Sequence, residues 1–546
     1  MGAAAGMVVF FLLYGTSTLH PTYDAWILNG YDEWDIQQHY AGWVLFRNSH
    51  WAFPLGLADT IAAPDGTVIS FTDSIPWVSI FFKALRGVLP STFQWFGWYT
   101  LFCFAMQGAA GALLCARGQA KTGAGALVFS TLGGLLFVML PTLWERAFRH
   151  TALASQWLFL LALYAFLEYR QNLHSGTAKF PWAMPVLAFL AVGIHPYFLP
   201  LVMMCALLAA VELGRQKKAW GRAALQFAAS LAAAVVGGVL CGAIGNITGA
   251  SRSGYGDYSM NLNALINPTS RGGYTWSRLY QVMPQQPGQY DGFNYLGLGV
   301  LALITAALLF SLRRAVRCPQ TKTWWHRNGP VFAACVLLTL FAVSNKIYWG
   351  NTGIELPLSA KLLELCGIFR SSGRMFYLVA ACMVVYAVYT LRDRLPGRYA
   401  VLVLALFVGV QAFDLSAAAQ QKRQKFADPI NATVVNNDQT ASLGAGHTQL
   451  LAAGEVREDR LRLLAILAGK QGLATNLDIA VSGSHPAAEA SRADTAARLA
   501  AGRYDPTAVY VTTDGETWEN WQAVFAGDDS LNFFVADSCY FMVPAV

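Results

Sequence analysis

The sequence contains few charged residues, and this deficit excludes an ordinary soluble protein. Only 13% of its 546 residues are Asp, Glu, Lys or Arg, whereas 55% are hydrophobic. A soluble domain typically carries about 25% charged residues. The mean hydropathy is +0.39. We therefore expect an integral membrane protein.

Cysteine pairs with the spacing of a metal or redox site are also missing. None of the nine cysteines forms a CxxC pair, so we expect neither disulfides nor a structural zinc site. Basic patches with interleaved aromatic residues are missing too. The net charge of +7 is what cytoplasmic loops require and predicts no nucleic-acid partner.

Long charge-free runs predict about eleven transmembrane helices, since a crossing takes about 20 helical residues. The runs lie near residues 3–19, 92–116, 123–143, 151–167, 180–195, 196–211, 223–246, 293–312, 329–345, 375–391 and 399–413. We interpret the first run as a retained helix rather than a cleaved signal peptide. The run at 75–89 contains Lys83 and Arg86 and predicts an amphipathic helix in the external interface.

The distribution of Lys and Arg predicts the orientation. Short basic connections follow alternate spans, and we expect them in the cytoplasm. The opposite connections, at 20–91, 144–150, 247–292 and 346–374, are longer and rich in aromatic residues, His, Asp and Asn. We expect them on the external face.

The composition changes after residue 413. Residues 414–546 carry charges throughout, and short apolar runs such as "AVYVTT" alternate with helical ones such as "REDRLRLLAILAGK". This alternation predicts a small, soluble α/β domain. With eleven crossings it would be external, following a membrane domain that spans 1–413.

The stretch "YDEWDIQQHYAGW" (31–43) gathers acids directly after the first span. In a helix, Asp32, Asp35 and His39 would share one face, and Glu33 would turn away. Such a face suits a general base or a divalent cation. The alternative is an interfacial helix whose acids stabilise its N-terminus.

Two more external segments carry candidate residues. "SFTDSIPW" places Asp73 before the interfacial helix, where Asp73 or Ser74 could equally be an N-cap. "LWERAFRHTALASQW" places Arg149 and His150 just outside a span.

"GIHPYFLP" places His195 and Tyr197 in a turn between two spans that leave it little room to project. A polar turn at that depth predicts a cavity beneath the external surface. His195 is either a substrate contact or a packed histidine.

The remaining candidates suit a phosphorylated sugar. Arg370 and Arg374, in "CGIFRSSGRMFY", oppose the dipole of the span that follows and suit a phosphate; the alternative is contact with lipid headgroups. Asp257 and Tyr295 lie in loops rich in Tyr and Asn, which suit sugars but also interfacial anchoring.

These stretches resemble the GT-C superfamily of membrane glycosyltransferases. The similarity lies in "WDIQQHYAGWVLFRNSHWAFPLG", "FTDSIPW", "GIHPYFLP", "YLGLG" and "FRSSGRMFY", which look like a bacterial branch described as a domain of unknown function. The resemblance implies a location in a bacterial inner membrane, a polyprenyl-phosphate-linked sugar donor and a base in the first external loop. By position this base is Asp35, with Asp32 as the next candidate.

Our hypothesis is an inverting transferase that acts on a cell-envelope acceptor (glycan, lipid or protein). Asp35 is the base, and Asp32 and His39 orient it. Arg370 and Arg374 bind the donor phosphate. Further expected substrate contacts are Asp73, Arg149, His150, His195, Tyr197, Asp257 and Tyr295. No metal ligands are assigned, because an Asp-x-Asp pair is missing; a divalent cation, Mg²⁺ or Mn²⁺, stays open. The alternatives are a flippase or transporter of lipid-linked glycans and a non-catalytic envelope scaffold.

Overall fold

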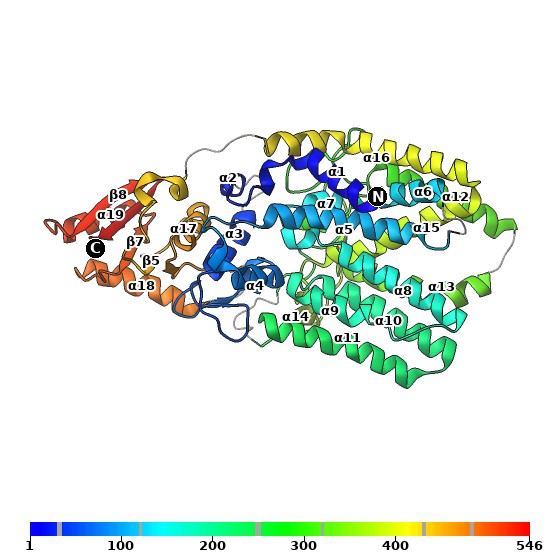
Figure 1. The fold of residues 1–546 in the computed structure, drawn as a ribbon, viewed down its shortest axis with the longest axis horizontal. Helices are drawn as coiled ribbons and strands as arrows, with labels where there is room; N and C mark the ends of the chain where they lie inside the picture. The colour runs from blue at the N-terminus through cyan, green and yellow to red at the C-terminus, as the bar shows by residue number, and fades with distance from the viewer. Residues whose placement is uncertain are drawn as a thin grey trace.

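The protein is an elongated molecule with a helical bundle at one end and a sheet-containing region at the other (Figure 1). The computed structural model describes residues 1–29, 35–119, 123–245, 253–317, 321–427, 433–480 and 485–545. The N-terminus lies in the bundle, and the C-terminus lies in the sheet region (Figure 1).

Eight helices of the described chain are long and apolar enough to cross a membrane, which indicates a membrane protein. They are α5 (Phe96–Ala116), α8 (Trp157–Ser175), α10 (Phe198–Lys217), α11 (Trp220–Cys241), α12 (Leu298–Arg317), α13 (Thr321–Val343), α15 (Phe376–Arg394) and α16 (Gly397–Lys425). Three predicted spans form shorter apolar helices: α1 (Gly2–Tyr14), α6 (Ala124–Val138) and α9 (Ala183–Ile194).

Glycines let α1 pack tightly against α5. A Cβ at Gly6 would collide with the carbonyl oxygen of Phe104, and one at Gly108 would collide with that of Gly2. Small residues four apart, such as Gly2 and Gly6, allow this close approach between helices in a membrane. The N-terminal helix is therefore an integral part of the bundle.

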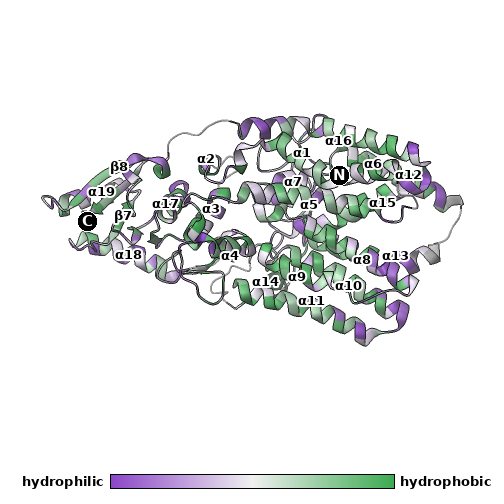
Figure 2. Ribbon diagram, in the orientation of Figure 1, coloured by the Kyte–Doolittle hydropathy of each residue, from purple (hydrophilic) through white to green (hydrophobic). Residues whose placement is uncertain are grey.

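The basic connections predicted to be cytoplasmic lie together at one end of the bundle. Arg117 Nε donates to Glu168 Oε1 over 2.5 Å, and Arg392 donates to the Arg117 carbonyl. Arg215 Nη2 donates to the His326 carbonyl over 2.6 Å. Hydrophilic helix ends gather at this end, opposite the sheet region (Figure 2).

Short elements make up the connections between the long helices. They are α2 (Ala25–Leu28), α3 (Asp35–Phe46), α4 (Pro76–Ala84), α7 (Pro141–Arg146) and α14 (Ala360–Gly367), with 3-10 turns of four residues such as η2 (Ile69–Thr72), η4 (Thr151–Ala154), η5 (Gln289–Gly292) and η6 (Ser372–Met375). Two antiparallel hairpins join them: β1 (Leu57–Ala58) with β2 (Thr67–Val68), and β3 (Lys346–Trp349) with β4 (Thr352–Glu355).

The interfacial run at 75–89 does form a helix, α4, but its lysine turns inward. Lys83 is buried, and its Nζ donates to Ser49 Oγ over 2.6 Å and to the His50 carbonyl over 3.1 Å. These hydrogen bonds hold α4 against the segment that follows α3, and the charge of Lys83 does not face lipid headgroups.

The C-terminal region is the small α/β domain that the sequence predicts. Its five-stranded sheet has the order β6-β5-β7-β9-β8. The strands are β5 (Gln449–Ala452), β6 (Ala474–Thr475), β7 (Ala508–Thr512), β8 (Leu531–Ala536) and β9 (Cys539–Pro544), and the helices are α17 (Glu458–Lys470), α18 (Pro486–Ala500) and α19 (Gly515–Val524). β5 is parallel to β6 and β7, and β9 is antiparallel to β7 and β8.

Alternate residues of the sheet pack in two different cores, because successive side chains point to opposite faces. Val509 and Val511 belong to the large core that continues into the helical bundle. Ala508 and Tyr510 belong to a second core with α18 and α19. The domain is therefore joined to the bundle by one continuous apolar core.

Helix α17 packs directly against α3. A Cβ at Gly469 would collide with Val44, and Asn48 Nδ2 donates to the Gly469 carbonyl over 2.6 Å. Lys470 Nζ lies 2.8 Å from Asp24 Oδ2. The C-terminal domain thus holds the helix that begins with Asp35.

The predicted start of the tail at 414 lies inside α16, which continues to Lys425. Asp414 is fully buried; it accepts hydrogen bonds from the Tyr295 hydroxyl over 2.6 Å and from Ser277 Oγ over 2.5 Å. Our interpretation of Asp414 as the first residue of a polar tail is therefore wrong. These donors satisfy its carboxylate, and helical geometry continues through it.

Candidate functional site

Helix α3 presents two of the predicted residues to the centre of the molecule. Asp35 is the first residue of α3, and His39 follows one turn later, buried. The side chain of Asp35 is 32% exposed, and its Oδ2 lies 3.4 Å from His150 Nε2. His150, rather than His39, is therefore the imidazole at ion-pair distance from Asp35. Asp32 lies outside the described residues.

The turn that carries Asp73 is tied to α3 through hydroxyl groups. Ser74 Oγ donates to the His39 carbonyl over 2.7 Å, and Thr72 Oγ1 lies 2.7 Å from Ser74 Oγ. A Cβ at Gly42 would collide with both hydroxyls. Glycine at this position of α3 therefore lets the turn approach His39.

Asp73 does not cap the helix that follows it. The N-cap residue of α4 is Ile75, with no side-chain capping bond, and Asp73 has the left-handed conformation (φ 54°, ψ 22°). The N-cap alternative for Asp73 or Ser74 is therefore wrong. A left-handed non-glycine residue is strained and persists only where surrounding contacts impose it.

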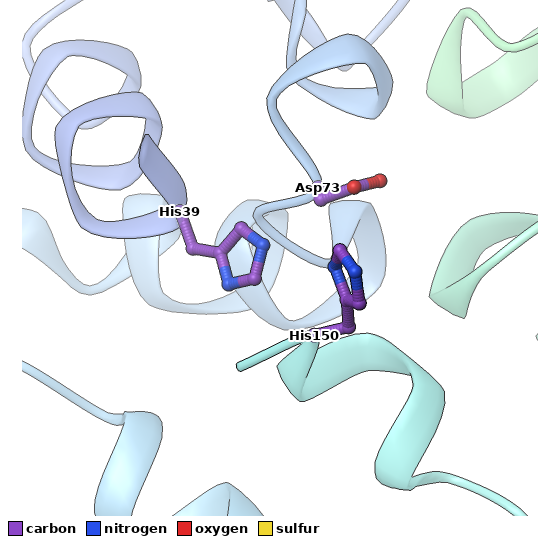
Figure 3. Close-up of side chains that lie close together, drawn as sticks. All are labelled: His39, Asp73 and His150. Atoms are coloured by element: carbon purple, nitrogen blue, oxygen red, sulfur yellow. The ribbon is translucent and has the colours of Figure 1, made fainter. Parts of the chain in front are cut away.

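His150 approaches the same place from the segment after α7. Its ring centroid lies 6.5 Å from that of His39. Phe148 just before it has φ 65°, and its ring packs edge-on to Tyr14 at 4.8 Å and to Trp26 at 4.6 Å. This aromatic contact orients the turn. Donor atoms of His39, Asp73 and His150 all lie within 4.8 Å of one another (Figure 3).

The turn between α9 and α10 completes one side of the site. His195 is buried, and its Nε2 lies 3.8 Å from Asp73 Oδ1. Tyr197 accepts a hydrogen bond from the Ser371 amide over 2.9 Å and carries the guanidinium of Arg374 on its ring at 4.7 Å.

Asp291 is the partner of two arginines at this site. Arg146 Nη1 donates to Asp291 Oδ1 over 2.6 Å, and Arg374 Nε donates to Oδ2 over 3.1 Å. All three side chains are buried. The sequence places these residues at 146, 291 and 374, and no local signal pairs them; Arg146 and Asp291 are therefore site residues that only the fold identifies.

The other basic candidates have separate partners. Arg149 is buried and forms an ion pair with Glu145 one turn away. Arg370 lies over the ring of Tyr258 at 5.7 Å. Arg370 precedes η6, which contains Arg374, so the two do not share a face of α15.

Two predicted substrate contacts have structural partners. Asp257 forms an exposed ion pair with Lys346 over 2.6 Å, at the β3 hairpin. Tyr295 is fully buried and donates its hydroxyl to Asp414. Tyr295 therefore joins the start of α12 to α16.

Burial keeps the histidines neutral. It lowers the pKa of His39 to about 3. Burial also lowers the pKa of His150 and of His195 well below the ordinary value, and the nearby Arg374 reinforces both shifts. At pH 7 these rings are therefore neutral and resist protonation, and each keeps a ring nitrogen that can bind a ligand.

The carboxylates differ in their protonation. Burial raises the pKa of Asp35, with Arg149 opposing, and raises that of Asp73 to about 6, with Arg374 opposing. Burial also disfavours ionisation of Asp291, yet Arg146 and Arg374 hold its pKa well below the usual range. Asp291 is therefore a permanent anion, whereas Asp35 and Asp73 titrate closer to neutrality.

The chain matches two family models. One, described as "Domain of unknown function (DUF6311)", matches residues 3–416. The other, described as "DUF6311 C-terminal domain", matches residues 439–544. No curated protein matches the chain.

Proposed function

We propose that this chain, which belongs to the DUF6311 family, is a membrane glycosyltransferase of the GT-C type. It transfers a sugar from a polyprenyl-phosphate-linked donor to a cell-envelope acceptor on the external face. The observation that carries the proposal is the convergence of α3, the Asp73 turn, the His150 turn and η5 on one site at the end of the apolar bundle. Acids, imidazoles and guanidiniums there are the groups that glycosyl transfer from a phosphate needs.

Asp35 is the proposed general base. It is partly exposed, so an acceptor hydroxyl can reach it. Its raised pKa makes it a stronger base than an ordinary carboxylate. The acceptor oxygen loses its proton to Asp35 and attacks the anomeric carbon, while the bond from that carbon to the phosphate oxygen breaks. The configuration inverts, and polyprenyl phosphate leaves. Asp32 stays a second candidate.

The arginines supply charge for the donor phosphate. Arg146 and Arg374 share the single carboxylate of Asp291, so this group carries one excess positive charge. Arg370 lies close enough to influence Asp73, as Arg374 does. Guanidiniums bind phosphate oxygens through paired donors, and Asp291 holds two of them in place.

We also propose that α1, α6 and α9 cross the membrane with the eight longer helices, making eleven crossings. The tight packing of α1 on α5 and the gathering of basic connections at one end support this topology. The basic end would then be cytoplasmic, and the C-terminal domain would be periplasmic in a bacterial inner membrane.

The test is transfer of radiolabelled sugar from synthetic polyprenyl-phosphate donors in reconstituted vesicles. We expect Asp35→Asn to lower kcat at least about 100-fold, the usual contribution of a general base. The matched control is Asp59→Asn in the same loop, whose exposed carboxylate pairs only with His50 among the described residues.

The donor side has its own readout. We expect Arg370→Gln to raise KM for the lipid-linked donor more than it lowers kcat, because it weakens phosphate binding. A wild-type protein that moves donor across the bilayer without transfer would identify a flippase. Full activity of Asp35→Asn would refute the assignment of the base.

A further inference from the structure

We propose that His39, Asp73 and His150 bind a divalent transition-metal ion of the zinc type. Each residue offers one donor atom, and these atoms all lie within 4.8 Å of one another. Figure 3 shows the His39 ring directed from α3 toward the His150 ring and the Asp73 side chain. Three separate segments of the chain supply the donors, so the fold alone creates this site.

The ring of His39 is buried at this site. Nδ1 of His39 is buried and has no hydrogen-bond partner among the described residues. His39 itself is only 1% exposed. A buried polar atom without a partner costs roughly 1–3 kcal/mol. Figure 3 shows that the other ring nitrogen, Nε2, faces His150 and Asp73, so Nε2 is the ligand atom of His39 in this proposal.

The donor set selects the class of ion. Two imidazole nitrogens and one carboxylate oxygen suit Zn²⁺ and its neighbours, whereas Mg²⁺ and Ca²⁺ prefer oxygen ligands. Three protein ligands leave a coordination position for water or substrate, as in catalytic zinc sites. Of the two cations that the sequence left open, Mg²⁺ therefore fits these ligands poorly.

Only a small adjustment would bring the donors to bonding distance. Ligands of a tetrahedral zinc ion lie about 3.4 Å apart, and the present separations do not exceed 4.8 Å. The hydrogen bond from Ser74 to the His39 carbonyl already holds the Asp73 turn against α3. Side-chain movements of about 1 Å, without backbone rearrangement, would close the site.

The surrounding groups resemble the outer contacts of metal sites. Asp35 Oδ2 lies 3.4 Å from His150 Nε2, and carboxylates at this distance orient ligand imidazoles and raise their basicity. His195 Nε2 lies 3.8 Å from Asp73 Oδ1 on the other side.

This ion site overlaps the proposed transferase site, but the inference does not rest on the transfer reaction, and its test uses no activity measurement. The full-length protein is purified in detergent, stripped with a chelator and titrated with Zn²⁺, Mn²⁺ or Mg²⁺. Calorimetry gives the affinity, and elemental mass spectrometry gives the bound equivalents. We expect one tight equivalent of Zn²⁺, weaker Mn²⁺ and the weakest binding for Mg²⁺.

Substitution identifies the ligands. Asp73→Asn, His39→Gln and His150→Gln should each weaken the tight Zn²⁺ site by at least about 100-fold, since second-shell changes alone cost 10- to 100-fold. The control is His50→Gln, an exposed histidine paired with Asp59, which should keep the tight site. Thermal unfolding of the metal-free proteins identifies the variants that fold. If a histidine variant does not fold, the near-isosteric Asp73→Asn variant provides the test of the site.

Three results would overturn the inference. The first is a wild-type protein without a tight Zn²⁺ equivalent. The second is a folded Asp73→Asn protein that binds Zn²⁺ as tightly as wild type. The third is Mg²⁺ binding at least as tight as Zn²⁺, which would indicate an all-oxygen site elsewhere.

Discussion

Arg146 Nη1 donates a hydrogen bond to Asp291 Oδ1 over 2.6 Å, and both side chains are buried. The same carboxylate also holds Arg374. One acidic residue therefore neutralises charge on two arginines from segments more than 200 positions apart. We therefore expect the positions of both guanidinium groups to depend on Asp291.

Replacing Asp291 with Asn should destabilise the protein by about 3–5 kcal/mol, because it leaves buried guanidiniums without a counter-charge. Unfolding in detergent with added denaturant measures the change. The control is Asp257→Asn, which removes an exposed ion pair with Lys346 and should cost less than about 1 kcal/mol. Equal effects of the two substitutions would contradict the structural role of Asp291.

Replacing Gly42 with Ala should displace the Asp73 turn from α3, because the added Cβ collides with the hydroxyls of Thr72 and Ser74. We expect a loss of about 1–3 kcal/mol in stability, together with weaker Zn²⁺ binding. Gly409→Ala in α16 is the control, since a Cβ there meets nothing within 4 Å. Wild-type stability and metal affinity in Gly42→Ala would show that α3 and the turn are not in tight contact.

Replacing Gly469 with Ala should loosen the C-terminal domain from α3, because the Cβ collides with Val44. Limited proteolysis should then cut the chain between the bundle and the domain faster than in wild type. In Gly515→Ala the nearest atom to the new Cβ is the Tyr540 hydroxyl oxygen at 3.7 Å, an ordinary contact, so this control should digest like wild type. An unchanged digestion rate in Gly469→Ala would argue against tight docking.

Replacing Tyr295 with Phe separates a structural role from substrate binding. The change removes one hydrogen bond to the buried Asp414 and should cost about 1–3 kcal/mol of stability. In the transfer assay KM for donor and acceptor should stay at the wild-type value. A raised KM for donor or acceptor in Tyr295→Phe, with unchanged stability, would instead indicate that Tyr295 contacts substrate.

The titration of Lys83 should make the free energy of unfolding increase as the pH rises above 8. Burial and Arg86 lower its pKa to about 8, with Asp59 opposing. Below pH 8 the folded and unfolded chains both hold the proton; between pH 8 and the ordinary pKa of about 10.4 the unfolded chain binds more protons, so the free energy of unfolding increases. The gain over this window is on the order of 3 kcal/mol.

Comparison with Lys83→Met isolates this effect from other titrating groups. The difference in unfolding free energy between wild type and variant should shift in favour of wild type as pH rises from 8 to about 10.4. A difference that stays constant with pH would mean that Lys83 keeps its ordinary pKa in the folded state.

Composition and local pattern by themselves determined the helical membrane bundle and the α/β C-terminal domain. Charge-free runs form helices because an apolar chain satisfies its backbone hydrogen bonds internally. Each of the eleven predicted runs contains a helix, and the apolar run "AVYVTT" forms the fully buried strand β7. The grouping of basic connections at one end also follows from the spacing of the runs.

Only the tertiary structure decided which polar residues meet. Asp35 touches His150 rather than the nearby His39, and Asp291 pairs with arginines that lie far from it in the sequence. Asp414 and Tyr295, predicted as a tail residue and a sugar contact, satisfy each other in the core. Local patterns carry no information on such pairs, because the free energy of burying a polar group depends on partners that long-range packing brings to it.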